Sequence, residues 1–516
     1  MKFTKIILVL SILLVNVKMQ GQLFTTLFED KNQINLQPGH LRLNTLQIDG
    51  KIYYTIPSGP KIADGPQLCV VDVNGKNGRV IPGTFMIGTN FLAATDMFIY
   101  YCSYDGTKKL YNLYRMNKAT EKVEVVTYET TNKPWQYSYD YGAADAKMYT
   151  YKDKLVLVGF LNDYQNKKLL RSLCVIEDNL PVAITLSLND SWGQNNEFQT
   201  NSTPVKDEIA ITDSSIYFYQ NDTIKNRKIN IRFYKRDNIK NKKPYEYAST
   251  IPIAENGMEP IEYKMLYVNK KIFTLLKPLD KKNTSDNAFL FEGQNYTVSS
   301  YLKGFELSSY NVFMKAFGNI IYIGDRFHLY KYETEAKRLT LLLNIKPEAA
   351  GLLKGISFIQ NQEYLLQGTD GTIFAAINTF HDFGPNNPRK NGYQKIVAIN
   401  PNNTVDTLFT TWVNCAREIN TLDENPNFVL GKSLYKIGQK STTDWKTTEE
   451  WLEKYSKENN WKPIRIDIPE VKKYDKYVNT TTQPNVLQLP YGLLIKAKYY
   501  GKKNLKEKEV MYLFTE

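Results

Sequence analysis

The sequence predicts an all-β protein folded as a β-propeller. A pattern of apolar strand, tight polar turn and apolar strand recurs along the chain, and its strands are rich in β-branched and aromatic residues. Successive copies lie about 55 residues apart on average, as four-stranded propeller units do. Because one such sheet cannot bury both of its faces alone, we expect each sheet to cover its neighbour.

The recurring hairpin is expected nine times. Further strand-like runs follow it in several copies, such as "LYNLYRM" (110–116) and "QKIVAINP" (394–401), so each unit has three or four antiparallel strands. Propellers usually have about four to eight blades. We therefore expect eight blades, with seven and nine left open. The expected hairpins span residues 46–56, 92–102, 148–159, 209–219, 265–276, 313–324, 356–368, 428–438 and 486–497.

Two segments stand apart from this repeat. The run "TTDWKTTEEWLEKYSKENN" (442–460) is expected to form a helical insertion, because Trp445, Trp451 and Tyr455 lie near helical spacing. The run "LFTTLFED" (23–30) is expected to complete the last blade, whose "EVMYLF" (509–514) ends the chain. Stacked β-sandwiches would show linkers and a parallel β-helix would need shorter repeats, so both alternatives are disfavoured.

The N-terminal residues indicate export. Lys2 and Lys5 precede the apolar run 6–15, and a small residue, Gly21, follows. This pattern is typical of a secretory signal peptide cleaved near Gly21, with a buried strand as the alternative. Neither this run nor any later one is long and apolar enough to span a bilayer. We expect residues 1–21 to be removed and 22–516 to form one monomeric propeller domain, secreted to the periplasm or the cell exterior.

Charge and cysteine usage set further bounds. The formal net charge is +13, and about +10 without the N-terminal lysines. A basic surface favours association with polyanions, although a codon bias toward lysine explains it as well. The four cysteines stand singly in or beside apolar runs and form no CxxC motif, so we expect buried thiols. A Cys69–Cys102 bridge is the alternative; the other two cysteines are Cys174 and Cys415.

Two short turns carry a family resemblance. The segments "SYDGT" (103–107) and "GTDGT" (368–372) share Asp-Gly-Thr. This turn resembles that of secreted bacterial propellers whose repeats carry a longer Leu-Trp…Thr-Asp-Gly-Thr…Gly-Thr pattern; the Leu-Trp pair and the rest of that pattern are missing here. The resemblance implies a propeller scaffold outside the cell and no particular reaction. Asp-Gly is also a favoured hairpin turn for conformational reasons alone.

Motifs of common enzyme classes are missing from the sequence. It contains no GxSxG nucleophile elbow, no HExxH zinc motif, no GxxxxGK[ST] phosphate loop and no GxGxxG. Its three histidines are widely separated, so we expect no metal site and no cofactor. The best catalytic candidates are His381, Asp382 and Arg389, in the long loop 378–393, because loops on a rigid scaffold often carry function.

One aromatic row suits ligand binding. Strand alternation in "NKPWQYSYDYGAAD" (132–145) places four aromatic side chains on one side. They could stack on sugar rings or on a partner, and burial between blades is the alternative. The row consists of Trp135, Tyr137, Tyr139 and Tyr141.

A basic segment is the second binding candidate. The run 232–247 crowds cations onto an expected hairpin, and 277–286 has the same character one unit further on. We expect neighbouring units to place both on one rim, where an acidic polymer could bind. A solvated loop that blocks edge pairing is the alternative. The candidate residues are Arg232, Lys235, Arg236, Lys242 and Lys243.

The sequence therefore favours a secreted, non-catalytic propeller that binds a protein or polysaccharide ligand, an acidic ligand being the best match to its charge. A glycan-active hydrolase or lyase is the first alternative, and an accessory part of an envelope assembly is the second. No nucleic-acid partner is expected, since no recognition helix or RNA-binding signature occurs.

Overall fold

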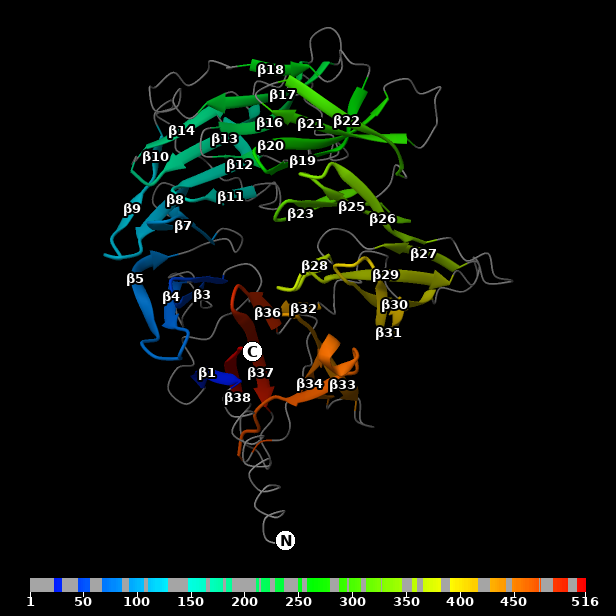
Figure 1. The fold of residues 1–516 in the computed structure, drawn as a ribbon. Coiled ribbons are helices and arrows are strands. Elements are labelled where there is room, and N and C mark those ends of the chain that lie inside the picture. The colour runs from blue at the N-terminus through cyan, green and yellow to red at the C-terminus, as the bar shows by residue number, and fades with distance from the viewer. Residues whose placement is uncertain are drawn as a thin grey trace. The chain divides into compact units, whose positions relative to one another are not determined.

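The protein is an all-β propeller. In the computed structural model, 38 strands form nine sheets, and a three-residue 3-10 turn is the sole helical element of the described residues (Figure 1). The structure describes residues 23–29, 45–55, 67–85, 92–105, 110–128, 147–163, 168–179, 182–187, 210–212, 215–222, 228–235, 249–252, 258–278, 287–294, 297–307, 312–325, 327–345, 355–359, 365–381, 390–415, 427–441, 448–472, 474, 486–499 and 508–516.

The chain divides into two compact units, and each is considered by itself. Unit 1 comprises residues 1–89, 366–376 and 381–516, and unit 2 comprises residues 90–365 and 377–380. We number the sheets 1 to 9 along the chain. Sheets 1, 8 and 9 lie in unit 1, sheets 2 to 6 lie in unit 2, and sheet 7 spans the division.

The sheets of unit 2 are antiparallel meanders in chain order. Sheet 2 contains β6 (Leu92–Ala94), β7 (Phe98–Asp105), β8 (Leu110–Asn117) and β9 (Val123–Val125), and sheet 3 contains β11 (Lys147–Tyr151), β12 (Lys154–Asp163), β13 (Lys168–Glu177) and β14 (Val182–Ser187), with β10 (Thr127–Tyr128) added parallel to β14. Sheet 4 contains β15 (Ala210–Ile211), β16 (Ser215–Asp222), β17 (Lys228–Lys235) and β18 (Ser249–Pro252), and sheet 5 contains β19 (Met258–Val268), β20 (Lys271–Pro278), β21 (Asn287–Gln294) and β22 (Thr297–Glu306). Sheet 6 contains β23 (Phe313–Phe317), β24 (Ile320–Gly324), β25 (His328–Glu333) and β26 (Arg338–Asn344).

The remaining sheets follow the same plan with two variations: sheet 7 has an additional short strand, and sheet 9 includes the first strand of the chain. Sheet 1 contains β2 (Thr45–Ile48), β3 (Lys51–Thr55), β4 (Gln67–Asp72) and β5 (Arg79–Phe85); sheet 7 has the order β27 (Gly355–Ile359), β29 (Ile373–His381), β30 (Lys390–Ile399) and β31 (Val405–Cys415), with β28 (Leu366–Gln367) also paired to β29; sheet 8 contains β32 (Phe428–Leu430), β33 (Ser433–Ser441), β34 (Thr448–Tyr455) and β35 (Ile464–Asp467); and sheet 9 has the order β36 (Val486–Leu489), β37 (Gly492–Tyr499), β38 (Lys508–Phe514) and β1 (Phe24–Glu29).

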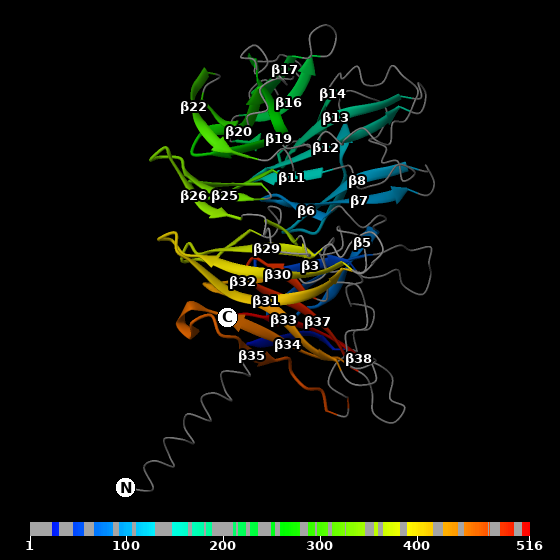
Figure 2. The same ribbon diagram turned by 90° about the vertical axis from the view of Figure 1, so that its right-hand side faces the viewer.

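Within each unit, first strands of several successive sheets lie side by side, which is how propeller blades are arranged. In unit 2, β6 lies beside β11, and β19 lies between β15 and β23. In unit 1, β28 lies beside β32. Figure 2 shows the strand pairs β30–β31 and β33–β34 as layers lying against each other, as the 4.6 Å separation of the Phe409 and Tyr455 rings requires. The sequence predicted eight blades; the described residues form nine sheets.

Eight of the nine expected hairpins are confirmed by strand pairing. The seventh prediction, at 356–368, was wrong, because this segment holds β27 and β28, and both pair with β29. The turn lies instead at Asp370-Gly371. There the Asp370 Oδ1 accepts a hydrogen bond from the Thr372 N–H at 3.0 Å, and Gly371 takes a φ of +85°, a conformation that glycine adopts without strain.

The expected closure of sheet 9 by the N-terminal strand is confirmed. Strand β1 pairs antiparallel with β38, from Phe24 opposite Phe514 to Glu29 opposite Val510. In Figure 1 the blue β1 accordingly lies beside the red β38. Leu27 is buried against residues of sheets 1 and 9. One strand from the start of the chain thus holds the outer edge of a sheet made from its end.

The expected helix at 442–460 is not formed by the residues described there, 448–460. They contain strand β34, followed by a 3-10 turn at Lys457–Asn459. Glu450 and Leu452 are buried on one face of sheet 8, while Trp451 and Glu453 lie on the other. Both edges of β34 are paired, with β33 and with β35. Period-two burial and pairing on both sides outweigh the helical spacing of the aromatic residues.

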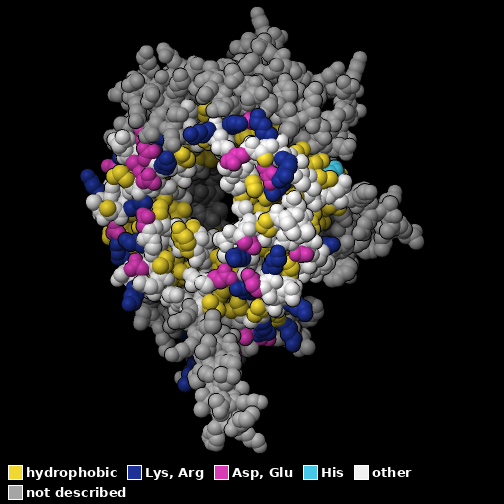
Figure 3. Space-filling model, in the orientation of Figure 1, with side chains coloured by type: hydrophobic (Ala, Val, Ile, Leu, Met, Phe, Trp, Pro, Cys, Tyr) yellow, Lys and Arg dark blue, Asp and Glu magenta, His cyan; other side chains and the backbone are white. Residues whose placement is uncertain are grey.

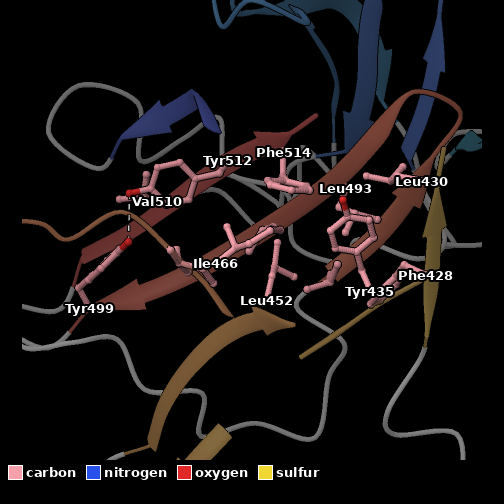
Figure 4. Close-up of a cluster of buried hydrophobic side chains, with 14 residues drawn as sticks. Phe428, Leu430, Tyr435, Leu452, Ile466, Leu493, Tyr499, Val510, Tyr512 and Phe514 are labelled. Carbon is pink, nitrogen blue, oxygen red and sulfur yellow. Dashed lines mark hydrogen bonds between the residues drawn. The ribbon is translucent and has the colours of Figure 1, made fainter. Parts of the chain in front are cut away.

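Apolar side chains of neighbouring sheets form the core. Figure 4 shows the cluster between sheets 8 and 9, where Leu452 and Ile466 meet Leu493, and where the hydroxyls of Tyr499 and Tyr512 lie 3.0 Å apart. A corresponding cluster joins sheets 5 and 6 around Phe273 and Ile321. In both places one sheet covers the apolar face of the next, as the sequence predicted.

Tyrosine has a recurring place in these interfaces. It is the third residue of the second strand in five sheets. In two of them its hydroxyl donates to a carboxylate of the next sheet, Tyr100 to Asp178 at 3.3 Å and Tyr435 to Glu516 at 3.1 Å. Tyrosine therefore supplies both apolar cover and a hydrogen bond between sheets. The five residues are Tyr53, Tyr100, Tyr217, Tyr322 and Tyr435.

Cys69 confirms the expectation of a buried thiol. It lies in β4, is fully buried and forms no disulfide. Burial raises the pKa of the Cys69 thiol to about 12, and a hydrogen bond with Tyr54 opposes part of this shift. The state of the other three thiols stays a prediction.

Candidate functional site

Exposed large apolar side chains of the described residues occur in two places. Three lie at or beside the turn between the first and second strands of a sheet, which we call the first-hairpin turn. They are Tyr491 in unit 1, and Met97 and Tyr267 in unit 2, with 78%, 50% and 38% of their surface exposed. The others lie on fourth strands: Val125, Leu341, Val405 and Ile464.

Hydrogen bonds between neighbouring sheets fix several of the first-hairpin turns. In unit 2 the Asp96 N–H donates to the Lys152 carbonyl at 3.0 Å, which joins the turns of sheets 2 and 3. In unit 1 the Thr369 N–H donates to the Gly431 carbonyl at 2.8 Å. The Tyr491 N–H donates to Gln47 Oε1 at 3.3 Å. A side chain carried on such a turn projects from a backbone that is already ordered.

A polar cluster under the turn of Met97 is the strongest example of this anchoring. The Asp178 carboxylate accepts hydrogen bonds from Thr95 Oγ1 at 2.5 Å, from the Met97 N–H at 2.9 Å and from the Tyr100 hydroxyl. Burial raises the pKa of Asp178, and these hydrogen bonds oppose the shift. Arg115 stacks over the Phe98 ring at 4.2 Å and donates to the Asp178 carbonyl.

A tyrosine–lysine platform lies where sheets 4 and 5 meet. We define it as Tyr217, Tyr267 and Lys270. The two tyrosine rings are nearly parallel, with centroids 6.4 Å apart and an interplanar angle of 18°. Lys270 is exposed at the tip of the β19–β20 turn. Lys271 is not part of the platform, because its ammonium forms an ion pair with the buried Glu292.

Sheet 8 carries a second group of aromatic and charged side chains. Glu453 accepts hydrogen bonds from the Tyr455 hydroxyl at 2.6 Å and from Trp451 Nε1 at 3.1 Å, and it pairs with Lys436 at 3.2 Å. Burial raises the pKa of Glu453, but these three partners outweigh it and leave the pKa lowered. Arg465 stacks on Trp451 at 4.2 Å and pairs with Glu449. These contacts order the face of sheet 8 that meets sheet 7.

The catalytic candidates from the sequence are largely outside the described residues. The expected loop 378–393 was wrong at both ends, because residues 378–381 belong to β29 and residues 390–393 belong to β30. His381 is the last residue of β29, and nothing is described of its side chain; Asp382 and Arg389 lie outside the described residues. His328 lies 3.3 Å from the buried carboxylate of Asp325 and stabilises a turn of sheet 6. Within the described ranges, no group of three or more His, Cys, Asp and Glu side chains is arranged to hold a metal ion.

The binding candidates from the sequence are placed only in part. Trp135, Tyr137, Tyr139 and Tyr141 lie outside the described residues, as do Arg236, Lys242 and Lys243. Arg232 and Lys235 belong to β17, where Arg232 pairs with Phe218 and Lys235 with Ser215.

The expected common rim for the two basic segments was wrong. Lys235 pairs with Ser215, beside the first-hairpin turn of sheet 4. Lys277 pairs with Glu259, at the end of sheet 5 remote from its first-hairpin turn. The reason is that one segment follows a third strand and the other follows a second strand, and successive antiparallel strands end on opposite sides of a sheet.

Sequence reasoning missed the platform. The signal was present in "YVNKK" (267–271), where a tyrosine precedes a two-residue Asn-Lys turn. Because successive side chains of a strand point to opposite faces, Tyr267 lies on the face of β19 away from that of the buried Val268. The sequence predicts only a strand and a turn here, since exposure of one face cannot be inferred from a single alternating pair.

Charge is mixed on the face shown in Figure 3, where basic and acidic side chains of the described residues are interspersed with apolar ones. Among the same residues, no helix has the length and apolarity needed to cross a membrane.

Comparison with known proteins identifies no family. No family model and no curated protein matches the sequence. Similar solved structures include dipeptidyl peptidase 4 of Porphyromonas gingivalis, with 9% identity, a TM-score of 0.42, and coverage of 89% of this chain and 64% of that chain. The WD40 domain of SCAP from fission yeast has 10% identity, a TM-score of 0.30, and coverage of 93% and 97%. The polysaccharide lyase Uly1 has 9% identity, a TM-score of 0.33, and coverage of 85% and 94%.

The chain spans less than two thirds of the two peptidases, 64% of dipeptidyl peptidase 4 and 55% of a prolyl endopeptidase. Likeness at these identities and TM-scores carries no argument about activity, ligand or partner.

Proposed function

We propose that the protein is exported after cleavage near Gly21 and acts as a non-catalytic binding propeller. Its ligand, a polysaccharide or a protein, would contact the first-hairpin turns. The observation that supports this proposal is the exposure of Met97, Tyr267 and Tyr491 at these turns.

Such side chains suit recognition for a physical reason. Tyrosine and methionine are enriched in interfaces, where they release water from a large apolar surface on contact. A side chain on a hydrogen-bonded turn loses little conformational freedom when it binds, so more of the contact energy remains as affinity. Met97 and Tyr491 meet this condition through hydrogen bonds of their own backbone N–H groups, to Asp178 and Gln47.

The proposal is tested with the protein beginning at Gln22. It is applied to a glycan array, and each retained polysaccharide is then incubated with the protein and assayed for new reducing or unsaturated ends. We expect retention without cleavage. Single replacements of Met97, Tyr267 and Tyr491 by serine should include at least one that weakens retention about fivefold or more, as loss of a central contact does.

Matched controls are available on the fourth strands. Leu341→Ser and Val405→Ser remove apolar groups away from the first-hairpin turns, with exposure between that of Tyr267 and that of Met97, and should leave retention unchanged. Cleavage of a retained polysaccharide that disappears in His381→Ala would refute the proposal and establish the glycan-active enzyme instead.

A further inference from the structure

The tyrosine–lysine platform has the form of a binding subsite. Tyr217 belongs to β16 of sheet 4 and Tyr267 to β19 of sheet 5, so the ring pair joins two sheets of unit 2. Tyr217 is half-buried, whereas Tyr267 remains 38% exposed. Contact with Tyr217 restricts the Tyr267 ring in advance, which lowers the entropy that a ligand would have to remove.

The turn that carries Lys270 is conformationally unusual. Asn269 and Lys270 have φ values of +49° and +61°, the pair of left-handed residues that a type I′ turn requires. Asn-Gly is the favoured sequence for this turn, and lysine in the left-handed region costs about 1 kcal/mol. Lysine occupies this tip, where glycine would be less strained, and Lys270 is exposed three residues along the chain from Tyr267.

Basic residues lie at the described edge of the platform. The hairpin segment 265–272 contains two lysines and no acidic residue. Glu292 pairs with Lys271, which leaves the charge of Lys270 uncompensated by that carboxylate. At the same end of sheet 4, the last residue of β17, Lys235, lies opposite Ser215, which is two residues from Tyr217. An anionic ligand would therefore be attracted to this edge.

We propose that the platform binds a segment of an acidic polysaccharide. A sugar ring lies against Tyr267, and an anionic group on the sugar pairs with the Lys270 ammonium. This inference rests on the proposed function and names the ligand class for one of its turns. The shared chemistry is a pyranose with a carboxylate or a sulfate: the apolar C–H face of the ring matches the tyrosine, and the charge matches the lysine.

The test uses charged and uncharged forms of the same polymers. Binding of the protein beginning at Gln22 is measured by biolayer interferometry on immobilised polygalacturonate and dextran sulfate, and on fully methyl-esterified polygalacturonate and plain dextran. We expect at least one charged polymer to bind about fivefold or more tightly than its uncharged form, and added salt to reduce that difference. Binding to polygalacturonate would indicate a carboxylate ligand, and binding to dextran sulfate would indicate a sulfate ligand.

Two variants test the platform residues. Lys270→Asn keeps a residue that tolerates the left-handed turn, and it should weaken binding of the charged polymer about three- to fivefold without changing binding of the uncharged form. Tyr267→Ala should weaken both forms about five- to tenfold. Lys337→Asn is the matched control, because Lys337 is also exposed with a φ of +51°, in the β25–β26 turn of sheet 6. It should bind like the unmodified protein, and so should Leu341→Ala.

The outcomes separate this inference from the proposed function. If neither charged polymer binds, or if Lys270→Asn and Lys337→Asn weaken binding equally, the acidic-polysaccharide inference is overturned. If Tyr267→Ala weakens charged and uncharged forms while Lys270→Asn changes neither, the inference fails and binding at the first-hairpin turns stands. If glycans are retained on the array and none of the three serine variants weakens retention, the proposed function itself fails.

Discussion

Asp178 and Glu453 are carboxylates whose surroundings move their pKa values in opposite directions. Burial dominates at Asp178 and raises its pKa. At Glu453 burial also raises the pKa, but Tyr455, Lys436 and Trp451 stabilise the charged form and lower it overall. The two residues should therefore contribute to stability with opposite dependence on pH.

Replacement of Asp178 by asparagine should destabilise the protein by about 1–2 kcal/mol, since the Met97 N–H or Thr95 hydroxyl loses its acceptor. Because the folded pKa is raised, the folded state binds the proton more tightly, and stability from this group falls as pH rises from about 4 through the folded pKa. The advantage of the unmodified protein over Asp178→Asn should thus be largest in acid. Urea unfolding at stepped pH measures it, and an advantage that grows with pH would contradict the assignment.

Glu453→Gln should show the reverse dependence of its stability cost on pH. The folded pKa of Glu453 is lowered, so its stabilisation is complete above the unfolded pKa of about 4.3 and is lost as pH falls through the folded value. The variant should cost about 1–3 kcal/mol at neutral pH, because Lys436 loses its charged partner, and much less in strong acid. Urea unfolding at stepped pH measures this cost as well. A cost independent of pH would rule out this account.

Strand β34 is the element that most separates sequence from structure. Its aromatic residues fit a helix by spacing, yet the same segment alternates between buried and outward residues once β33 and β35 flank it. A short segment can satisfy both periods, and only long-range pairing decides between them. The first-hairpin turns were predictable for the opposite reason: their strands and their turn residues are adjacent in the sequence, as at Asp49-Gly50, where both φ values are positive.

Gly438 tests the packing of sheet 8. A Cβ at this position would collide with Trp451 Nε1 and would lie 2.6 Å from Glu453 Oε1. Gly438→Ala should therefore cost about 1–3 kcal/mol through displacement of the indole. Chemical denaturation gives the cost, and tryptophan emission should shift to longer wavelength as the ring moves. Unchanged stability and emission would mean that Trp451 does not lie across β33.

Closure through β1 is a property of the whole molecule. The first strand holds the edge of the last sheet, so its loss should expose β38 and weaken the core that includes Leu27. A chain beginning at Lys31 should be less stable than one beginning at Gln22 by at least about 2 kcal/mol, the cost of removing one buried leucine. Hydrogen exchange of the amides of Val510–Phe514 should accelerate. Thr26→Ala, at an exposed position of β1, should change neither.

For the whole molecule, the sequence predicts the fold class and the hairpin repeat, because both depend on a pattern that recurs along the chain. It also predicts the pairing of β1 with β38, because both are strand-like runs near the two ends of the sequence. It does not reveal the platform, because Tyr217 and Tyr267 meet only after two sheets pack. The binding candidates chosen from the sequence were dense runs of aromatic or basic residues. The exposed side chains of the described residues are instead single residues at or beside turns, such as Tyr491 and Met97.

The rate at which the buried thiol of Cys69 is labelled would report how often sheet 1 opens. With Cys102, Cys174 and Cys415 replaced by serine, a maleimide can react only when β4 separates from its neighbours, since burial keeps the thiol protonated and covered. Labelling should be slow in buffer, faster in mild urea, and faster still without β1, which packs in the same cluster. Rapid labelling in buffer would show that this sheet opens locally without global unfolding.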